Sequence, residues 1–151
     1  MKKYAVILLT VLFGVLLLVP DTWAEGQELN KKPLSELTSD VKEAVFNDIK
    51  NMREFDGVGE VEVDEKDRKC VMFVFAKPSI DDYSTKVMGT SSALTMVETL
   101  MANGRDPYEE HLWIRCSVAV RGKTATGRDG MRVLGAAHYD YNTDSIKWEW
   151  R

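Results

Sequence analysis

The residues that carry most metal and redox chemistry are scarce in this chain. Its 151 residues include only two cysteines, Cys70 and Cys116, and two histidines, His111 and His138. The cysteines are too far apart for a C-x-x-C redox motif, and two cysteines alone make a poor metal site. Neither an H-E-x-x-H zinc motif nor a C-x-x-C-H haem motif occurs in the sequence. We therefore expect no resident metal and no cofactor.

Catalytic motifs are also missing. The sequence contains no nucleophile elbow of the kind found in serine hydrolases. The best remaining pairing is His138 with Asp140, which lie two residues apart on one face of a predicted strand. Glu149 offers His138 an ordinary structural partner in the same hairpin. A small periplasmic enzyme that uses His138 and Asp140 is therefore the least favoured function.

Positive charge is in deficit, since 20 lysines and arginines face 24 aspartates and glutamates, for a net charge of −4. This balance argues against a nucleic acid as the partner. The triplet Gly122-Lys123-Thr124 does not indicate a phosphate-binding loop. Such a loop needs a glycine five positions earlier, where Ser117 stands, and a helix afterwards, where a strand is predicted.

Basic residues nevertheless gather around this triplet. The segment Gly122–Gly130 is a predicted loop between two strands, and it is flanked or occupied by Arg121, Lys123, Arg128 and Arg132. These four side chains could hold an anion at one end of the sheet. The alternative is a solvated, mobile hairpin loop.

The one long apolar run lies at the N-terminus. Two lysines precede Tyr4–Val19, and small residues occupy the −3 and −1 positions of a cleavage site after Ala24. We predict a signal peptide over residues 1–24 and a periplasmic or secreted bacterial protein. The run is shorter than the roughly 20 residues that span a bilayer. An uncleaved segment is the alternative, and the only membrane contact that we expect.

The remaining chain divides into a short lead and one domain. Residues 25–37 are polar and contain Pro33, which is typical of a flexible lead. Residues 38–151 are enough for one hydrophobic core and too few for two. We predict a single, monomeric domain there.

The centre of this domain is a strand–helix–strand unit. Lys69–Ala76 has no polar face, which predicts a strand covered on both sides. A helix follows from Ser79 to about Asn103, with Gly104 as its stop. Leu112–Arg121 is a half-buried strand whose even positions face the core. Such a unit predicts a parallel crossover.

The helix carries an apolar stripe that we expect to face the core. Its members recur at helical spacing: Ile80, Tyr83, Val87, Thr90, Leu94, Val97 and Met101. Gly89 and Ala93 lie on a neighbouring flank, where they would allow close backbone approach.

The two cysteines fall in the two strands of this unit. Export would place them in an oxidising compartment, where a pair of cysteines usually closes. We therefore predict a Cys70–Cys116 disulfide; the alternative is two free, buried thiols.

The segment before this unit contributes a helix and a strand. The helix begins at Thr38 or Ser39 and ends at Gly57, and Val58–Val63 forms the strand. The turn Asp64–Arg68 leads back into Lys69–Ala76. Val63 lies opposite either Cys70 or Val71, and the two registers turn opposite faces of the second strand to the core.

The last hairpin is predicted to turn at Asn142–Ser145. Its register then places Tyr139 opposite Trp148 and His138 opposite Glu149. One face carries four aromatic residues: Tyr139, Tyr141, Trp148 and Trp150. They form either an exposed platform, for example for a sugar, or part of the core beneath the helices.

The element order is α-β-β-α-β-β-β, which predicts an α+β fold with a mainly antiparallel sheet and two helices packed on one face. Without catalytic motifs, the favoured function is a non-catalytic binding or interaction module of the bacterial cell envelope. Its partner would be an envelope protein or a small ligand. The alternative is a carrier of a small hydrophobic or anionic ligand.

Overall fold

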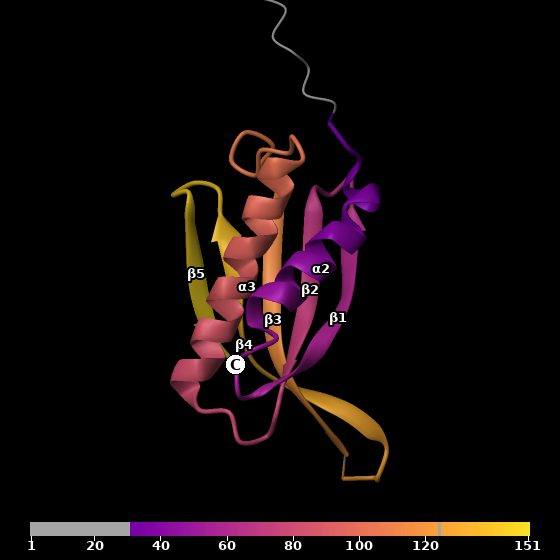
Figure 1. Ribbon diagram of the computed structural model, residues 1–151, viewed down its shortest axis with the longest axis vertical. Coiled ribbons are helices and arrows are strands. Elements are labelled where there is room, and N and C mark those ends of the chain that lie inside the picture. Colours follow the sequence, from indigo (N-terminus) through magenta and orange to yellow (C-terminus); the bar gives the residue numbers. More distant parts are fainter. Residues whose placement is uncertain (1–30, 124) are drawn as a thin grey trace, which may run out of the picture. The chain divides into compact units, whose positions relative to one another are not determined.

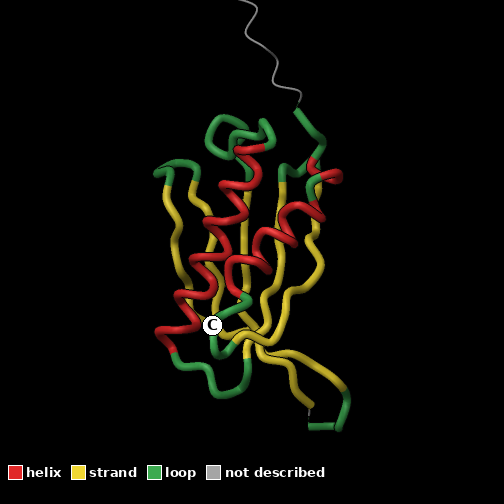
Figure 2. The backbone as a smooth tube through the Cα atoms, viewed as in Figure 1, coloured by secondary structure: helices red, strands yellow, loops and turns green. Residues whose placement is uncertain are grey.

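The computed structural model describes residues 31–123 and 125–151. The predicted signal peptide and its cleavage site lie outside these residues. The described chain is an α+β domain with two α-helices and one five-stranded sheet, as predicted (Figures 1 and 2). The elements in chain order are η2 (Leu34–Glu36), α2 (Thr38–Ile49), β1 (Phe55–Asp64), β2 (Lys69–Ala76), α3 (Asp82–Ala102), β3 (Trp113–Lys123), β4 (Asp129–Asp140) and β5 (Ser145–Trp150).

The strands lie side by side in sequence order, β1-β2-β3-β4-β5. β2 and β3 are parallel, as the strand–helix–strand pattern predicted, and the other neighbours are antiparallel. Helices α2 and α3 lie on the same face of the sheet and contact each other (Figure 1). The hydrophobic core lies between these helices and the sheet.

The first hairpin takes the register in which Val63 faces Cys70. Cys70, Met72 and Val74 are therefore buried beneath the helices. Phe73 and Phe75 point to the other face of the sheet and are half-buried. The prediction that Lys69–Ala76 is covered on both sides is wrong, because both described α-helices pack on one side.

Helix α3 turns a different stripe to the core than the sequence predicted. Tyr83, Leu94 and Met101 are 79%, 48% and 55% exposed. The buried stripe is made of smaller or more flexible residues: Thr85, Met88, Gly89, Ser92, Ala93, Met96, Val97 and Leu100. A Cβ on Gly89 would lie 2.3 Å from the Trp148 ring, so the close approach that we expected at Gly89 does occur, and against the sheet.

The last hairpin is shifted by two residues from its predicted register. Ala137 lies opposite Trp148, and Tyr139 lies opposite Ile146, because the turn begins one residue earlier, at Tyr141. The Tyr139 hydroxyl donates to Asp144 Oδ1 at 2.6 Å, which ties the turn to the strand. A shift of two residues preserves the faces, because side chains alternate with a period of two.

Both cysteines are free and buried, so the predicted Cys70–Cys116 disulfide is wrong. Cys70 lies opposite Ile114, and Cys116 lies opposite Met72, so the two are diagonal neighbours on parallel strands. Such neighbours are separated by about 8 Å between Cα atoms, which is beyond the range that a disulfide bridges without backbone movement. Burial raises the pKa of both thiols to about 12.

The described part of the predicted lead is packed on the domain. Leu34 and Leu37 are fully buried. Arg105, itself buried, donates from Nη1 to the Lys32 carbonyl at 3.1 Å and lies 2.8 Å from both Glu65 Oε1 and Glu110 Oε2 through Nη2. The ordered domain therefore begins before Thr38, and one arginine joins three segments of the chain.

Among the described residues, no helix combines the length and the apolar character needed to cross a membrane. No group of three or more histidine, cysteine and acidic residues there is placed to hold a metal ion.

Candidate functional site

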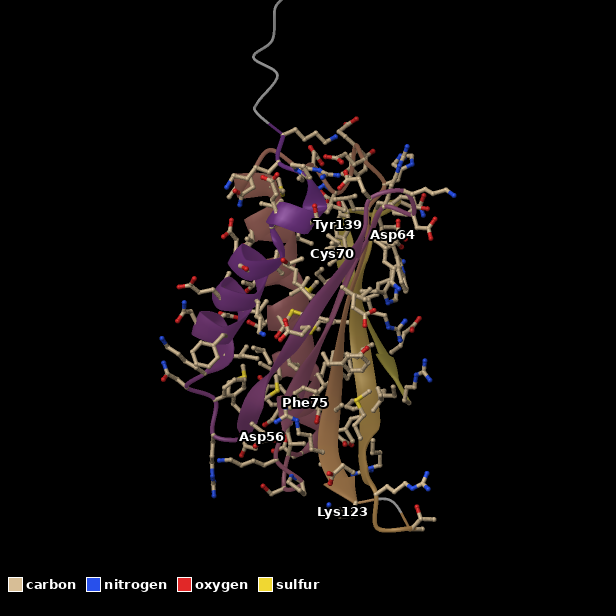
Figure 3. The ribbon with its side chains drawn as sticks, turned by 90° about the vertical axis from the view of Figure 1, so that its right-hand side faces the viewer. Asp56, Asp64, Cys70, Phe75, Lys123 and Tyr139 are labelled. Atoms are coloured by element: carbon tan, nitrogen blue, oxygen red, sulfur yellow. The ribbon has the colours of Figure 1, made fainter. Side chains whose placement is uncertain are left out.

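The face of the sheet opposite the two helices is the candidate site, and we call it the open face. Strand alternation places Phe73 and Phe75 of β2 on it, with Trp113 and Arg115 of β3 beside them. Figure 3 views the domain from the side, with α2 at the left and the strands, including Phe75 and Lys123, farther to the right. No described helix packs on this face.

A β-bulge in β4 changes which residues reach the open face. β4 pairs with β3 in one register up to Gly135 and in a shifted register from Val133 onward, so Leu134 is the extra residue. As a result Val133 lies opposite Ala119, and Met131 lies opposite Arg121. Two apolar side chains therefore join the open face that regular alternation would have placed beneath the helices.

The centre of the open face is a hollow. Ser117 and Ala119 are only 8% and 0% exposed, although they lie on the open face. Larger neighbours cover Ala119, whereas Ser117 lines a groove of about 370 Å³ together with Phe73, Trp113, Val133 and other residues of the face. We call this the central groove.

A second hollow of about 560 Å³ lies toward the β3–β4 hairpin, and Phe75, Arg121, Lys123 and Met131 are among its lining residues. The hairpin extends beyond the helices, with Lys123 near its tip (Figures 1 and 3). We call this hollow the hairpin groove. Both grooves are open to solvent and share strand β3.

A cation lies over an aromatic ring in each of the two grooves. The Arg121 guanidinium carbon is 3.9 Å from the centre of the Phe75 ring, and Lys69 Nζ is 5.8 Å from the centre of the Trp113 ring. Such contacts are worth about 0.5–1 kcal/mol at exposed sites. They hold the positive charge along the surface of the sheet.

Arg115 and Arg121 each have an acidic partner on the protein, which is distant and exposed. Arg115 Nη1 is 3.7 Å from Glu149 Oε2, and Arg121 Nη1 is 4.0 Å from Asp56 Oδ2. Exposed pairs of this kind contribute about 0–1 kcal/mol. Exchanging these acids for a carboxylate of a ligand would therefore cost little.

Three of the four basic residues predicted to bind an anion, Arg121, Lys123 and Arg132, line one hollow of about 320 Å³ in the β3–β4 hairpin. Arg121 and Lys123 are on the open face, and Lys123 pairs with Asp129 at 2.5 Å. Arg132 lies opposite Val120, whose side chain points to the other face. Arg128 belongs to the turn between the strands. The anion site stays a prediction, for which Arg121, Lys123 and Arg132 are the best placed residues.

The four aromatic residues of the last hairpin lie on the helix side and do not share one exposed surface. Tyr139 is buried, and the Trp148 ring packs against Gly89 and Gly135. Tyr141 stacks on His111 with ring centres 4.9 Å apart. Trp150 is exposed and contacts the Trp148 ring edge-on at 5.1 Å. Tyr139 and Trp148 therefore follow the core alternative.

His138 and Asp140 share the open face, with separate partners. His138 Nδ1 is buried, lies 3.9 Å from Glu149 Oε1 and makes no hydrogen bond within the described residues. Asp140 contacts the Lys147 ammonium and accepts from the Asn142 backbone N–H at 2.9 Å. The Lys147 contact, together with this hydrogen bond, lowers the pKa of Asp140 to about 2. Asp140 thus organises the turn.

Sequence reasoning missed the open face as a site, although its signal was present. Val71, Phe73 and Phe75 form an apolar face of β2, and we expected a second layer of structure to cover it. It also missed Arg105, because a lone arginine in the loop after a helix carries no pattern that distinguishes it from a solvated side chain.

Comparisons with known proteins add a distant likeness in structure. No family model matches the chain, and no curated protein matches it. A solved structure described as "Crystal structure of Sex pheromone staph-cAM373 precursor" aligns with a TM-score of 0.42 and 8% sequence identity. The alignment covers 82% of this chain but 53% of the other, so the chain spans about half the length of that protein. The chain is thus a small α+β domain that distantly resembles this precursor.

Proposed function

We propose that this domain is a non-catalytic binding module of the bacterial cell envelope and that it binds its partner through the open face. One observation carries the proposal. Trp113 and Met131 are 41% and 54% exposed on a sheet face that no described helix covers, and they accompany Phe73 and Phe75. Contiguous exposed apolar surface on a folded domain marks interaction sites more often than chance.

The composition of the open face supports the same proposal. Aromatic residues, methionine and arginine are enriched in protein interfaces, and tryptophan and arginine dominate their energetics. The open face combines these types, and Arg121 is already oriented by the Phe75 ring. A partner would bury the rings and gain contacts with an oriented cation.

The cellular location is part of the proposal and rests on the sequence. The apolar run Tyr4–Val19 with two lysines before it is typical of an export signal. A carrier of a small hydrophobic or anionic ligand is the second candidate, because the hairpin groove is within the roughly 300–1,000 Å³ of ligand pockets. Its openness to solvent favours a larger partner.

Site-specific photocrosslinking in the host cell tests the proposal. A photoreactive amino acid replaces Trp113 or Met131 on the open face, and Tyr83 or Leu94 on α3 as matched controls; all four positions are exposed. We expect a discrete crosslinked product from the open-face positions and none from the α3 positions. Products from α3 alone would show that the partner binds the helix side and would overturn the proposal. Native mass spectrometry of the purified protein would detect a bound small ligand instead.

A further inference from the structure

We infer that the partner presents an acidic segment with apolar side chains, which lies extended along β3 in the two grooves of the open face. This inference rests on the proposed function, because it names the chemistry that the open face recognises. Three features of the face lead to it: the charges that line the grooves, their spacing along β3, and the depth of the surface between them.

The residues that line the two grooves have an excess of positive charge. The cations are Lys69, Arg115 and Arg151 in the central groove and Arg121 and Lys123 in the hairpin groove. The acidic residues of the same two linings are Glu62 and Asp129, and Glu149 and Asp56 lie outside the linings, 3.7 and 4.0 Å from Arg115 and Arg121. Because the whole chain has a net charge of −4, this local excess opposes the charge of the protein. The grooves thus favour an anionic ligand.

The spacing of the two arginines suits an extended chain. Arg115 and Arg121 belong to the same strand and lie on the same face, six positions apart. At the rise of a β-strand this separation is about 20 Å. An extended peptide of six or so residues has the same length, so acidic residues near its two ends would reach both arginines. The intervening side chains would meet the apolar floor.

The depth of the face favours a peptide over a membrane surface. Trp113 and Met131 stand out near the two ends of the face, whereas Ser117 between them lines the central groove and is only 8% exposed. A flat bilayer would touch the raised ends and leave the hollow unfilled. The side chains of a peptide can enter it, which buries apolar surface at about 25 cal/mol per Å².

Phage display tests the inference. Random dodecapeptides are selected for binding to the full chain as isolated from the producing cell. We expect the selected sequences to be rich in aspartate, glutamate and apolar residues. In fluorescence polarisation, Arg115→Glu or Arg121→Glu should weaken binding of a selected peptide by about tenfold or more. Lys86→Glu is the matched control, because it reverses an exposed charge on α3 and should leave binding unchanged. Circular dichroism confirms that each variant is folded.

The outcomes separate the inference from the function on which it rests. Neutral or basic peptides that bind the open face would overturn the inference and leave the proposed function intact. If substitutions on α3 abolish peptide binding and substitutions on the open face do not, both the inference and the proposed function are overturned. Binding of phosphatidylglycerol vesicles without selection of any peptide would replace the acidic segment by an anionic membrane surface.

Discussion

In strand β2 both faces of the sheet carry apolar residues, yet the two faces differ in what covers them. On the helix side, Met72, Ile114 and Val118 are buried beneath α2 and α3. On the open face, Phe73 is half-buried and Trp113 is exposed, and Lys69 lies over the Trp113 ring. Hydrophobicity alone therefore does not reveal which face is the core. The cations interleaved with aromatic rings distinguish the open face.

Matched truncations on adjacent residues of β2 give the strongest test of this difference. Met72→Ala removes a fully buried side chain and should lower the free energy of unfolding by about 2–5 kcal/mol. Phe73→Ala removes a half-buried side chain and should cost about 1 kcal/mol. Urea unfolding of both variants measures the two values. Equal losses would mean that the open face belongs to the core.

Glycine substitutions probe the closeness of the helix to the sheet. Gly89→Leu would place a Cβ 2.3 Å from the Trp148 ring, so we expect a loss of about 1–3 kcal/mol or more. Gly122→Leu is the matched control on the β3–β4 hairpin, where a Cβ meets nothing within 4 Å. Thermal unfolding should separate the two variants clearly. A stable Gly89→Leu protein would contradict the packing of α3 on Trp148.

Two arginines distinguish structural charge from charge available for binding. Hydrogen bonds from Arg105 lower the pKa of Glu65. Burial alone would raise the pKa of Glu110, but hydrogen bonds from Arg105 and Lys31 outweigh it and lower that pKa as well. Both ionised carboxylates therefore stabilise the fold at a pH above 4.5, the ordinary pKa of a glutamate. This stabilisation is lost as the pH falls through the lowered pKa values of the folded protein.

Removing Arg105 should weaken this pH dependence. In Arg105→Met the two carboxyl groups return toward their ordinary pKa, so the protein should be less stable at neutral pH and lose less stability on acidification. Arg121→Met should keep the pH dependence of the original protein, because Arg121 does not contact these carboxylates. Unfolding free energies measured between neutral pH and pH 3 give the comparison. Identical profiles for both variants would exclude the role of Arg105.

Cysteine labelling tests the same difference between buried and exposed positions, and it is expected to disturb the fold least. Cys70 and Cys116 are buried thiols whose pKa is raised to about 12, so they should resist iodoacetamide at pH 8 in the folded protein. In unreduced denaturant both should react, and intact mass should show two additions. A cysteine introduced by Met131→Cys on the open face should react without denaturant. No reaction of the native pair in denaturant would indicate a disulfide after all.

The sequence predicted the fold well because its strongest signals are local. The alternation in β3, the glycine stop at Gly104, which has a φ of 76°, and the strand–helix–strand order all depend on neighbouring residues. The prediction of the buried face of α3 was wrong for a physical reason. Gly89, Ser92 and Ala93 are weakly apolar, but they allow the helix to approach the sheet, and this outweighed the larger residues of the exposed stripe.

The candidate site was harder to predict because it depends on irregularities. The extra residue at Leu134 reverses the facing of Val133 and Met131, and nothing in the local pattern places a bulge there. The two-residue shift of the last hairpin has a similar origin, since both turns fit the same polar segment. The observed turn is held by the hydrogen bonds from the Tyr139 hydroxyl to Asp144 and from the Asn142 N–H to Asp140.

The Arg105 cluster has a mechanical consequence. Residues 31–37 enter the domain at the end opposite the β3–β4 hairpin, and Figure 1 shows this arrangement. A tension applied at Lys31 would first load the ion pair of Lys31 with Glu110, at 3.0 Å, and then the Arg105 contact with the Lys32 carbonyl. It would then load the hydrogen bond from the Leu34 N–H to Glu65 at 2.8 Å, before any strand was pulled. A domain held at Lys31 would therefore direct the β3–β4 hairpin away from the held end, and the sheet would carry none of the initial load.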